Sequence, residues 1–524
     1  MSDILSPFKL KRYASLQITN NKKSSIKGNY SMNSNNPISM NSYMMNEKNN
    51  IINSFILVGC WNNIDCDKKA LNTPIFRDIV INEINKEYNK LVIVAGDNWY
   101  SQQYSYSESE YTYKYYPMQV LISGYELLLK NKKKFYDIIL GNHDEANDKI
   151  IDSSFNNVKK DCMLKIQKYV INNIVNTEIK TLKVKQDLLT NDKKNLAIPS
   201  LESLKNISTN NLQINNVHLL SCIDKPEIKE LNNNVYVVYI NTNLFDNYTY
   251  KIKNIDESNT ITTRIMLSYV ENIRKLLLIY APKLLFVVGH NPLIAYKKSK
   301  YHKLSDIYED QDNSYIMDML IQTLNNYKTI YLCADVHNFN IAKLNTNLGT
   351  VISGTGGGSP DLEKEEGNLN LLKSPNKKLL DITDHYVYNA YGYTKIKYDR
   401  KYNVYVTYKQ LFNAYKDIKF ENKLINKRII NYNFVFKNNE DGWKLEKLPN
   451  TISTRKMNLD IPKLVEHKKK MCSIIKSDNK SNITSLISKN QLVKSNVHNY
   501  NYLKNDKDTP LLCFYASKKK KQKK

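Results

Sequence analysis

Short apolar runs, each bounded by turn residues, recur along the chain from residue 51 onward. The clearest are SFILVG, KLVIVAG, FYDIILG, NVYVVYIN, KLLFVVG, KTIYLCA and GTVISG. Uninterrupted runs of Val, Ile, Leu and aromatic residues are typical of strands that are covered on both faces. Amphipathic stretches of helical length separate several of them, and residues 264–280 have apolar positions at three- and four-residue spacing. Strands that alternate with helices predict an α/β fold.

The distribution of these runs divides the chain into three parts. Residues 1–50 are rich in Ser, Asn and Lys without apolar periodicity, which predicts a flexible polar N-terminal arm. Residues 51–446 hold the strand-like runs, the last of which are YNVYVTYKQLF and IINYNFVF, and form the predicted domain. Within it, residues 146–233 contain a helical segment near 163–175 and exceed a normal connection, so we predict an insertion over one face. Residues 447–524 predict a basic, low-complexity C-terminal tail.

The positive charge of the chain is concentrated in that tail. The formal net charge is +26, and residues 448–524 hold 18 Lys and Arg against 5 Asp and Glu, a net of +13. The tail ends in SKKKKQKK and would bind nucleic acid or another polyanion by neutralising phosphates. Sequence-specific readout is not expected, because aromatic residues are sparse there. The alternative is a solvated end without function. Polyanion binding would suit a nucleic-acid-rich compartment or a virus particle.

Cysteine usage and targeting signals bear on the compartment. The seven cysteines are odd in number and show no pairing pattern, which favours a reducing compartment. The first residues contain no apolar core of signal-peptide length. The longest apolar run, residues 276–289, is interrupted by Pro282 and Lys283 and is too short to span a bilayer. We therefore expect a soluble intracellular protein without a membrane span.

Residues with metal-binding side chains follow four of the predicted strands. KLVIVA is followed by GDNWY, FYDIIL by GNHDE, KLLFVV by GHNP, and KTIYLC by ADVHN. Ligand sites collect at the carboxyl ends of strands in α/β sheets. Carboxylates, imidazoles, a carboxamide and a phenol are ligands for divalent and trivalent metals. If they converge, they could hold two metal ions that share a bridging carboxylate, and such a pair binds a phosphate ester and activates water.

Each segment also has an ordinary structural interpretation. A Gly-Asp-Asn sequence after a strand is more often a turn. A lone His290 would more often be structural, and Asp335 could cap a helix. The ordered series is harder to explain in this way, because each member follows its own apolar strand. His143 stands between Asn142 and Asp144, where it could act as general acid for the leaving alcohol.

In this order, the four segments resemble the motifs of the calcineurin-like metallophosphoesterases. Tyr100, three residues after Asp97, narrows the resemblance to the purple (tartrate-resistant) acid phosphatase branch. SGTGGGSP at 353–360 and YGYTKIKY at 391–398 are similar to later strands of that branch. The resemblance covers residues 51–398. It implies a four-layer sandwich of two β-sheets flanked by helices, with a dinuclear metal site at the strand ends and phosphomonoesters as substrates.

The resemblance also implies a role for individual residues. Asp97 would be the carboxylate that bridges the two metals. Tyr100 and His337 would bind the first metal, which is iron(III) in the family. Asn142 and His290 would bind the second metal, which is often zinc, manganese or iron(II).

Two positions depart from the pattern of that family. The first motif usually reads Gly-Asp-Trp-Gly and here reads GCWN, so Cys60 stands where a terminal carboxylate of the first metal is expected. The last motif normally begins Gly-His and here begins Ala334-Asp335. A thiolate binds iron or zinc, and Asp335 can replace an imidazole on a hard metal. Cys60 is therefore either a substituted ligand or a small buried hydrophobic residue.

Two functional hypotheses remain open. The first is a metal-dependent phosphoesterase in which His143 is the general acid and, by resemblance, is oriented by Asp144. The second is a catalytically impaired protein of the same fold with a structural or interaction role. The presence of His143 beside Asn142 favours the enzyme. A protein with only a structural or interaction role does not need a general acid at this position.

Overall fold

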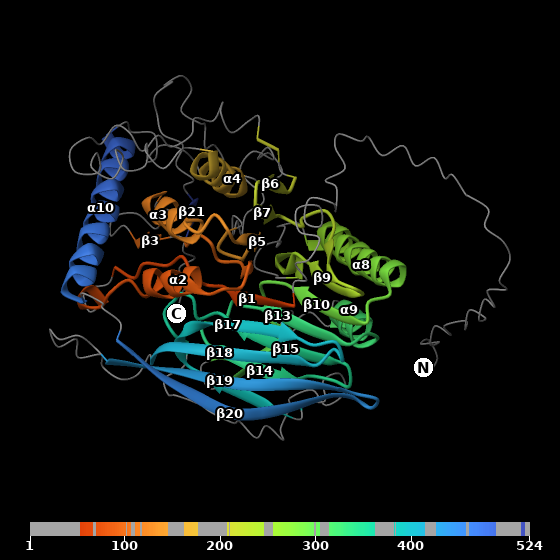
Figure 1. Cartoon of the computed structure of the whole chain (residues 1–524). Helices are drawn as coiled ribbons and strands as arrows, with labels where there is room; N and C mark the ends of the chain where they lie inside the picture. Colours follow the sequence, from red (N-terminus) through yellow and green to blue (C-terminus); the bar gives the residue numbers. More distant parts are fainter. Residues whose placement is uncertain are drawn as a thin grey trace. The chain divides into compact units, whose positions relative to one another are not determined.

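The computed structural model describes most of the chain after residue 52 (Figure 1). The described residues are 53–66, 70–100, 102–105, 111–115, 118–144, 162–176, 207–208, 210–245, 255–297, 300–303, 314–361, 382, 384–413, 426–456, 461–488 and 515–518. Residues 1–50 form a separate unit, and the arm predicted for them lies outside the described residues. Ile51–Lys524 forms the other unit.

Apolar runs from both halves of this unit form the first sheet. Its strands are β1 Ser54–Val58, β2 Leu91–Ala95, β5 Phe135–Ile139, β6 Leu212–Ile214, β7 Val217–Leu220, β17 Ala390–Tyr398, β18 Val404–Asn413, β19 Asn426–Asn439 and β20 Gly442–Lys456. Within the described residues it has nine strands, in the order β20-β19-β18-β17-β1-β2-β5-β7-β6. β1, β2, β5 and β7 run parallel, so their carboxyl ends lie at one edge.

The second sheet is built from the later apolar runs. Its strands are β8 Glu227–Asn232, β9 Val235–Tyr239, β10 Leu284–Val288, β13 Thr329–Cys333, β14 Phe339–Lys343, β15 Leu348–Ser353 and β16 His385–Tyr388. In the described part of the chain it has seven strands, in the order β16-β14-β15-β13-β10-β9-β8. β9, β10, β13 and β15 are parallel, and every residue of β9, β10 and β13 is buried, as expected of strands covered on both faces.

Alternate residues of β1 show how the layers pack. Phe55 and Leu57 belong to the core between the two sheets, where Phe55 meets Phe286 of β10 edge to face at 5.1 Å. Ile56 and Val58 belong to the core on the other side, beneath helices α2 Phe76–Lys86, α3 Met118–Leu128 and α4 Cys162–Asn176. Helices α8 Ile255–Tyr280 and α9 Ser314–Asn325 cover the outer face of the second sheet (Figure 1). The predicted four-layer α/β sandwich is confirmed.

The remaining elements are short, apart from one helix. They are 3-10 helices η1 Ala70–Asn72 and η2 Thr242–Phe245, the pair β11 Ile294–Lys297 and β12 Lys300–Lys303, the small sheet of β3 Gln102–Ser105, β4 Tyr111–Tyr115 and β21 Tyr515–Lys518, and helix α10 Ile461–Ser488. Among the described residues, none of the helices has the length and apolar character needed to cross a membrane.

The predicted insertion at 146–233 is in part integral to the fold. The helix predicted near 163–175 is α4, which packs on the first sheet. β6 and β7 extend that sheet, and β8 is an edge strand of the second. Residues 210–233 therefore belong to the sandwich rather than to an addition over one face. Residues 146–161 and 177–206 lie outside the described part.

The predicted boundary at residue 446 also changes. It falls inside β20, which continues to Lys456 and pairs with β19 along its length. Beyond it, α10 packs on the domain and carries Cys472, which forms a disulfide with Cys66. The sequence showed no pairing pattern because the two cysteines are 406 residues apart. The first part of the predicted tail is thus folded and covalently attached.

Candidate metal centre

The carboxyl ends of strands from both sheets supply the candidate ligands. In the first sheet, Cys60 follows β1, Asp97 follows β2 and Asn142 follows β5. In the second sheet, His290 follows β10 and Asp335 follows β13. Because β1, β2 and β5 are parallel neighbours, and β10 and β13 are also parallel neighbours, each sheet brings its own polar side chains together.

Three candidate ligands have a left-handed backbone. The φ angles are 48° at Cys60, 58° at Asp97 and 57° at Asp335. Residues other than glycine seldom adopt this conformation, which costs free energy and is concentrated at functional sites. Cys222, two residues after the end of β7, has the same conformation with φ 48° and is not a candidate ligand, so this backbone is shared by strand exits of the sandwich and does not by itself mark a ligand. The apolar and polar pattern carries no signal for this feature.

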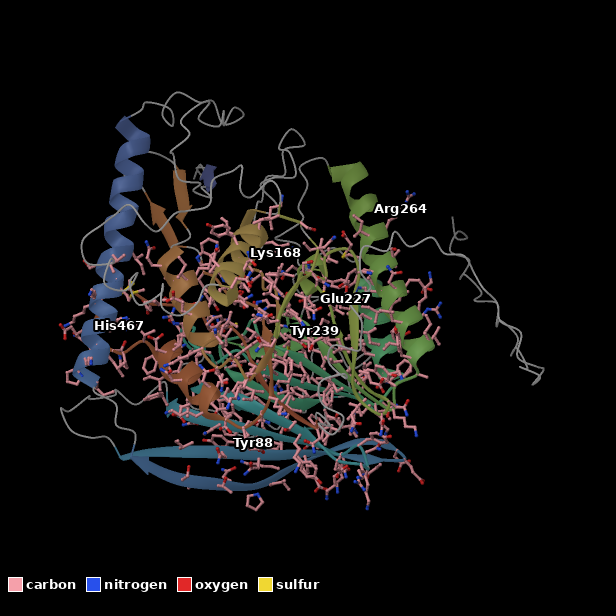
Figure 2. The ribbon with its side chains drawn as sticks, turned by 45° about the horizontal axis from the view of Figure 1, so that its top comes forward. Tyr88, Lys168, Glu227, Tyr239, Arg264 and His467 are labelled. Carbon is pink, nitrogen blue, oxygen red and sulfur yellow. A yellow bond between two sulfur atoms is a disulfide. The ribbon has the colours of Figure 1, made fainter. Side chains whose placement is uncertain are left out.

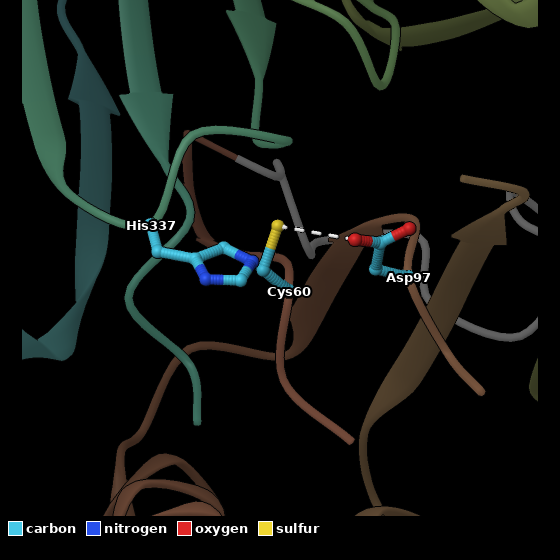
Figure 3. A group of neighbouring side chains, drawn as sticks. All are labelled: Cys60, Asp97 and His337. Carbon is cyan, nitrogen blue, oxygen red and sulfur yellow. Dashed lines mark hydrogen bonds between the residues drawn. The ribbon is translucent and has the colours of Figure 1, made fainter. Parts of the chain in front are cut away.

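A first donor set lies on one side of Asp97. Ligand atoms of Cys60, Asp97 and His337 all lie within 4.8 Å of one another (Figure 3). Cys60 Sγ is 3.5 Å from Asp97 Oδ2. The hydroxyl of Tyr100 is 3.3 Å from His337 Nε2. We call Cys60, Asp97, Tyr100 and His337 the first donor set.

A second donor set lies on the other side of the same carboxylate. His290 Nε2 is 3.2 Å from Asp97 Oδ1 and 3.2 Å from Asn142 Oδ1. Asp335 Oδ1 is 3.8 Å from the same nitrogen. We call Asp97, Asn142, His290 and Asp335 the second donor set. Asp97 therefore directs Oδ2 to one set and Oδ1 to the other.

Backbone carbonyls fix the tautomers of both histidines. His290 Nδ1 is 2.7 Å from the carbonyl oxygen of Ala95, and His337 Nδ1 is 2.6 Å from that of Ser359. A carbonyl oxygen only accepts, so Nδ1 carries a proton in each ring and donates it. Each Nε2 is then directed to a donor set, which is the arrangement that orients metal-binding histidines.

The charges of the donor atoms fit a bound cation. Burial raises the pKa of the Cys60 thiol well above its usual range, and Asp97 and Asp335 raise it further. Burial also raises the pKa of Asp97, but His290 and His143 outweigh it and lower that pKa. Burial lowers the pKa of His290, but Asp97 outweighs it and raises the value to about 9. A metal ion would displace the protons of the Cys60 thiol and of His290 Nε2. It would also replace the positive charge that protonated His290 places beside Asp97.

His143 lies beside the first donor set. Its ring packs against the ring of Tyr100, with centroids 4.6 Å apart. Its backbone N–H donates to Asp97 Oδ1 over 3.3 Å. Burial lowers the pKa of His143, and Asp97 acts in the opposite direction. The imidazole thus lies against Tyr100 of the first donor set, and the backbone of His143 contacts the carboxylate that both sets share.

Asp144 has a different role from the one expected. Its buried carboxylate accepts hydrogen bonds from the backbone and side chain of Asn98 at 3.0 Å, from Gly141 N at 2.7 Å and from Gln167 Nε2 at 3.0 Å. None of these bonds goes to His143, so Asp144 does not orient that ring. It ties the turn after β2 to the turn after β5, and burial raises its pKa to about 7.

The loop after β15 supports two residues of the first donor set, Cys60 and His337. The sequence did not indicate this role. Gly358 N–H donates to the carbonyl of Cys60 at 2.8 Å. A Cβ at Gly358 would lie 2.7 Å from Cε1 of His337, so a larger residue would push that ring out of its present position. Asp361 Oδ2 accepts from the backbone N–H of His337 at 2.7 Å. The glycine-rich run expected to resemble a strand therefore forms a supporting loop.

Thr242 supports the second donor set in a similar way. Its Oγ1 accepts from the backbone N–H groups of His290 and Asn291, at 3.0 and 2.9 Å. Thr242 begins η2, just beyond the end of β9. Its position after an apolar strand is a signal that could have identified it.

Comparisons with known proteins give little further information. No protein-family model matches the chain, and no curated protein matches it. Among solved structures, the chain is similar to one described as "Structure of PhoD", with 10% sequence identity and a TM-score of 0.38. The match covers 80% of this chain and 77% of that one. A similarity at this level assigns no function to this chain.

Proposed function

We propose that this protein is a metal-dependent phosphoesterase that hydrolyses phosphomonoesters at a dinuclear metal site. The observation that supports the proposal most is the position of Asp97, with Oδ2 at 3.5 Å from Cys60 Sγ and Oδ1 at 3.2 Å from His290 Nε2. A carboxylate that directs one oxygen to each of two donor sets is suited to bridge two cations.

The side chains divide the chemistry between them. Two bound cations would supply Lewis acidity toward the phosphate ester and activate water. The first and second donor sets would hold one cation each and share Asp97. His143 would protonate the oxygen of the leaving alcohol, since its ring lies against Tyr100 of the first set and has no ligand role. Asp144 and Thr242 would keep the ligand turns in position through the hydrogen bonds described above.

The resemblance and the donor types each favour particular metals. Resemblance to the purple acid phosphatases favours iron in the first set and zinc, manganese or iron in the second. A phenolate of Tyr100 on iron(III) would absorb visible light, so the colour of the purified protein reports it. The sulfur of Cys60 makes the first set softer and favours zinc or iron(II) over magnesium.

Substitution of Cys60 tests the proposal. Cys60→Asp is expected to keep or raise bound metal per chain, whereas Cys60→Ala should weaken metal affinity by at least about tenfold, because one donor is lost. Asp also tolerates the left-handed backbone at φ 48°, so the carboxylate variant should fold. The measurement is elemental analysis of the three proteins, purified without a reductant so that the Cys66–Cys472 disulfide stays formed, with a phosphatase assay across added zinc, manganese and iron.

The outcomes separate two claims. Equal occupancy in the wild type and Cys60→Ala would mean that Cys60 is not a ligand, while the phosphoesterase proposal would survive. A wild type and a Cys60→Asp variant that both bind no metal and hydrolyse no phosphomonoester would reject the proposed function itself.

The basic C-terminal end supports a second activity, the binding of nucleic acid or another polyanion. Residues 448–524 hold a net charge of +13. β21 pairs with β4 in a register that sets Lys518 opposite Tyr111, so the final lysines follow directly from a strand attached to the domain. Polyanion binding by such a run would depend on salt and not on sequence.

Removal of the lysines after β21 tests this activity. Replacing the five lysines within residues 519–524 by Gln should lower the salt concentration at which the protein elutes from a heparin column. Each lost phosphate contact should reduce the slope of log affinity against log salt by about 0.9. A deletion from residue 448 would be a poor test, because it removes part of β20. Unchanged elution of the Gln variant would exclude a role for these lysines.

A further inference from the structure

Helix α10 packs on the segment that follows Cys60. One buried apolar cluster contains residues from this segment, from the start of α2, from α3 and from α10: Ile64, Ile75, Val120, Met471, Cys472 and Ile475. The disulfide between Cys66 and Cys472 lies beside this cluster. Figure 1 shows α10 along the side of the domain, next to α2 and α3. The helix is therefore held by both packing and a covalent bond.

Polar contacts fix the same face of α10. Lys468 Nζ donates to Thr73 Oγ1 at 3.0 Å, and Lys468 is only 3% exposed. His467 Nδ1 lies 3.7 Å from Asp78 Oδ2, and Figure 2 shows His467 on the helix. Burial of an ammonium group is unfavourable unless it has partners, so the Lys468 contacts are specific to the docked position of the helix.

Residues 60–66 connect the first donor set to this contact. At its start, Trp61 Nε1 donates to Asn98 Oδ1 at 3.0 Å, and Asn62 Nδ2 donates to the carbonyl of Asn98 at 2.7 Å. At its end, Cys66 is bonded to α10. The segment is thus held at one end by Asn98, which follows Asp97, and at the other end by α10.

We propose that the Cys66–Cys472 disulfide makes α10 a covalent brace for residues 60–66, so that reduction of this bond releases the segment and exposes Cys60. Reduction adds two electrons and two protons, breaks the S–S bond and leaves a thiol on each residue. A small dithiol supplies both and closes to its own disulfide. Cys66 is partly exposed and Cys472 is 1% exposed, so the attacking thiolate reaches Cys66 and Cys472 leaves.

The brace gives the site a dependence on the redox state of its surroundings. With the disulfide formed, Cys60 is completely buried. With the disulfide reduced, the packing of α10 and the hydrogen bonds of Trp61 and Asn62 to Asn98 still hold the segment, but the covalent bond is gone and local opening becomes more frequent. This inference does not depend on hydrolytic activity, because exposure of Cys60 can be measured in protein stripped of metal.

Alkylation of individual cysteines tests the brace. Metal-free wild type, with its disulfide intact or reduced by a phosphine, is treated with iodoacetamide beside Cys472→Ser and Cys66→Ser. Mass spectrometry then gives the rate at each cysteine. Cys60 should react about tenfold faster or more in the reduced protein and in both variants than in the oxidised protein. Cys222 and Cys333, which are buried elsewhere in the sandwich, are the internal controls and should keep their rates.

Two results would overturn the brace. Equal rates at Cys60 in oxidised and reduced wild type would mean that α10 does not control this segment. A parallel rise at Cys222 and Cys333 would mean that the disulfide stabilises the whole domain rather than the segment. If metal and phosphatase activity prove absent while Cys60 alone responds to reduction, the brace stands and the proposed function fails.

Discussion

Asp97→Asn is expected to remove both metal ions and to lower kcat/KM for a phosphomonoester by on the order of 10³-fold or more. The substitution replaces the anionic oxygen that faces each donor set with a neutral amide, so both sets lose their shared charge. Asn tolerates the left-handed backbone that Asp97 adopts at φ 58°, so the turn should be kept. Elemental analysis and a phosphatase assay measure the two effects, and a thermal unfolding curve checks the fold.

A matched substitution elsewhere gives the control. Asp399 lies just after β17, where the N–H of Tyr398 donates to the carbonyl of Asn53 before the start of β1, at the end of the sheet away from the donor sets. Asp399→Asn should therefore retain full metal content. If the Asp97 variant also keeps two metals per chain, the bridging role is wrong. Loss of metal from both variants would indicate a general effect of destabilisation.

The strands were the most predictable part of the fold. KLVIVAG, KLLFVVG and KTIYLCA correspond to β2, β10 and β13, because parallel strands covered on both faces need an unbroken apolar run. The helix predicted at 264–280 is the C-terminal part of α8. In each case one physical requirement, the removal of apolar surface from water, determines the sequence over the whole element.

The elements that escaped prediction have weaker local signals. β6 and β8 are half-buried edge strands in which every residue is of intermediate burial, so polar residues are tolerated throughout. α10 looked like a basic tail because its buried contacts are few and include Lys468, a residue that composition assigns to the surface. The disulfide of Cys66 depends on a contact between distant parts of the chain, which no local pattern encodes.

For the candidate site, topology explains what could be predicted. Parallel strands bring their carboxyl ends together, so the side chains after β1, β2 and β5 had to lie near one another, and so did those after β10 and β13. The packing of the two sheets, which brings the two groups together, does not follow from this rule. The direction of each side chain was not predictable in this way. Asp144 follows His143 in sequence, yet its carboxylate accepts hydrogen bonds from Asn98 in the turn after β2 and from Gln167 in α4. Hydrogen-bond partners of buried loops depend on tertiary contacts.

His143→Ala is expected to keep the bound metal and to lower kcat by about 10²–10⁴-fold, the usual effect of removing a general acid. The ring of His143 belongs to neither donor set. Its backbone N–H, which donates to Asp97 Oδ1 at 3.3 Å, remains in the alanine variant. Metal content measured beside kcat therefore separates a loss of chemistry from a loss of the site.

The leaving group decides whether the lost function is proton donation. p-Nitrophenolate is a weak base and departs without a proton, whereas an alkoxide from glycerol phosphate needs one. The loss caused by His143→Ala should therefore be much larger for glycerol phosphate than for p-nitrophenyl phosphate. Equal losses on both substrates would mean that His143 positions the phosphate instead of protonating the alcohol. Wild-type rates on both would remove it from the mechanism, and the ring contact with Tyr100 would then be packing alone.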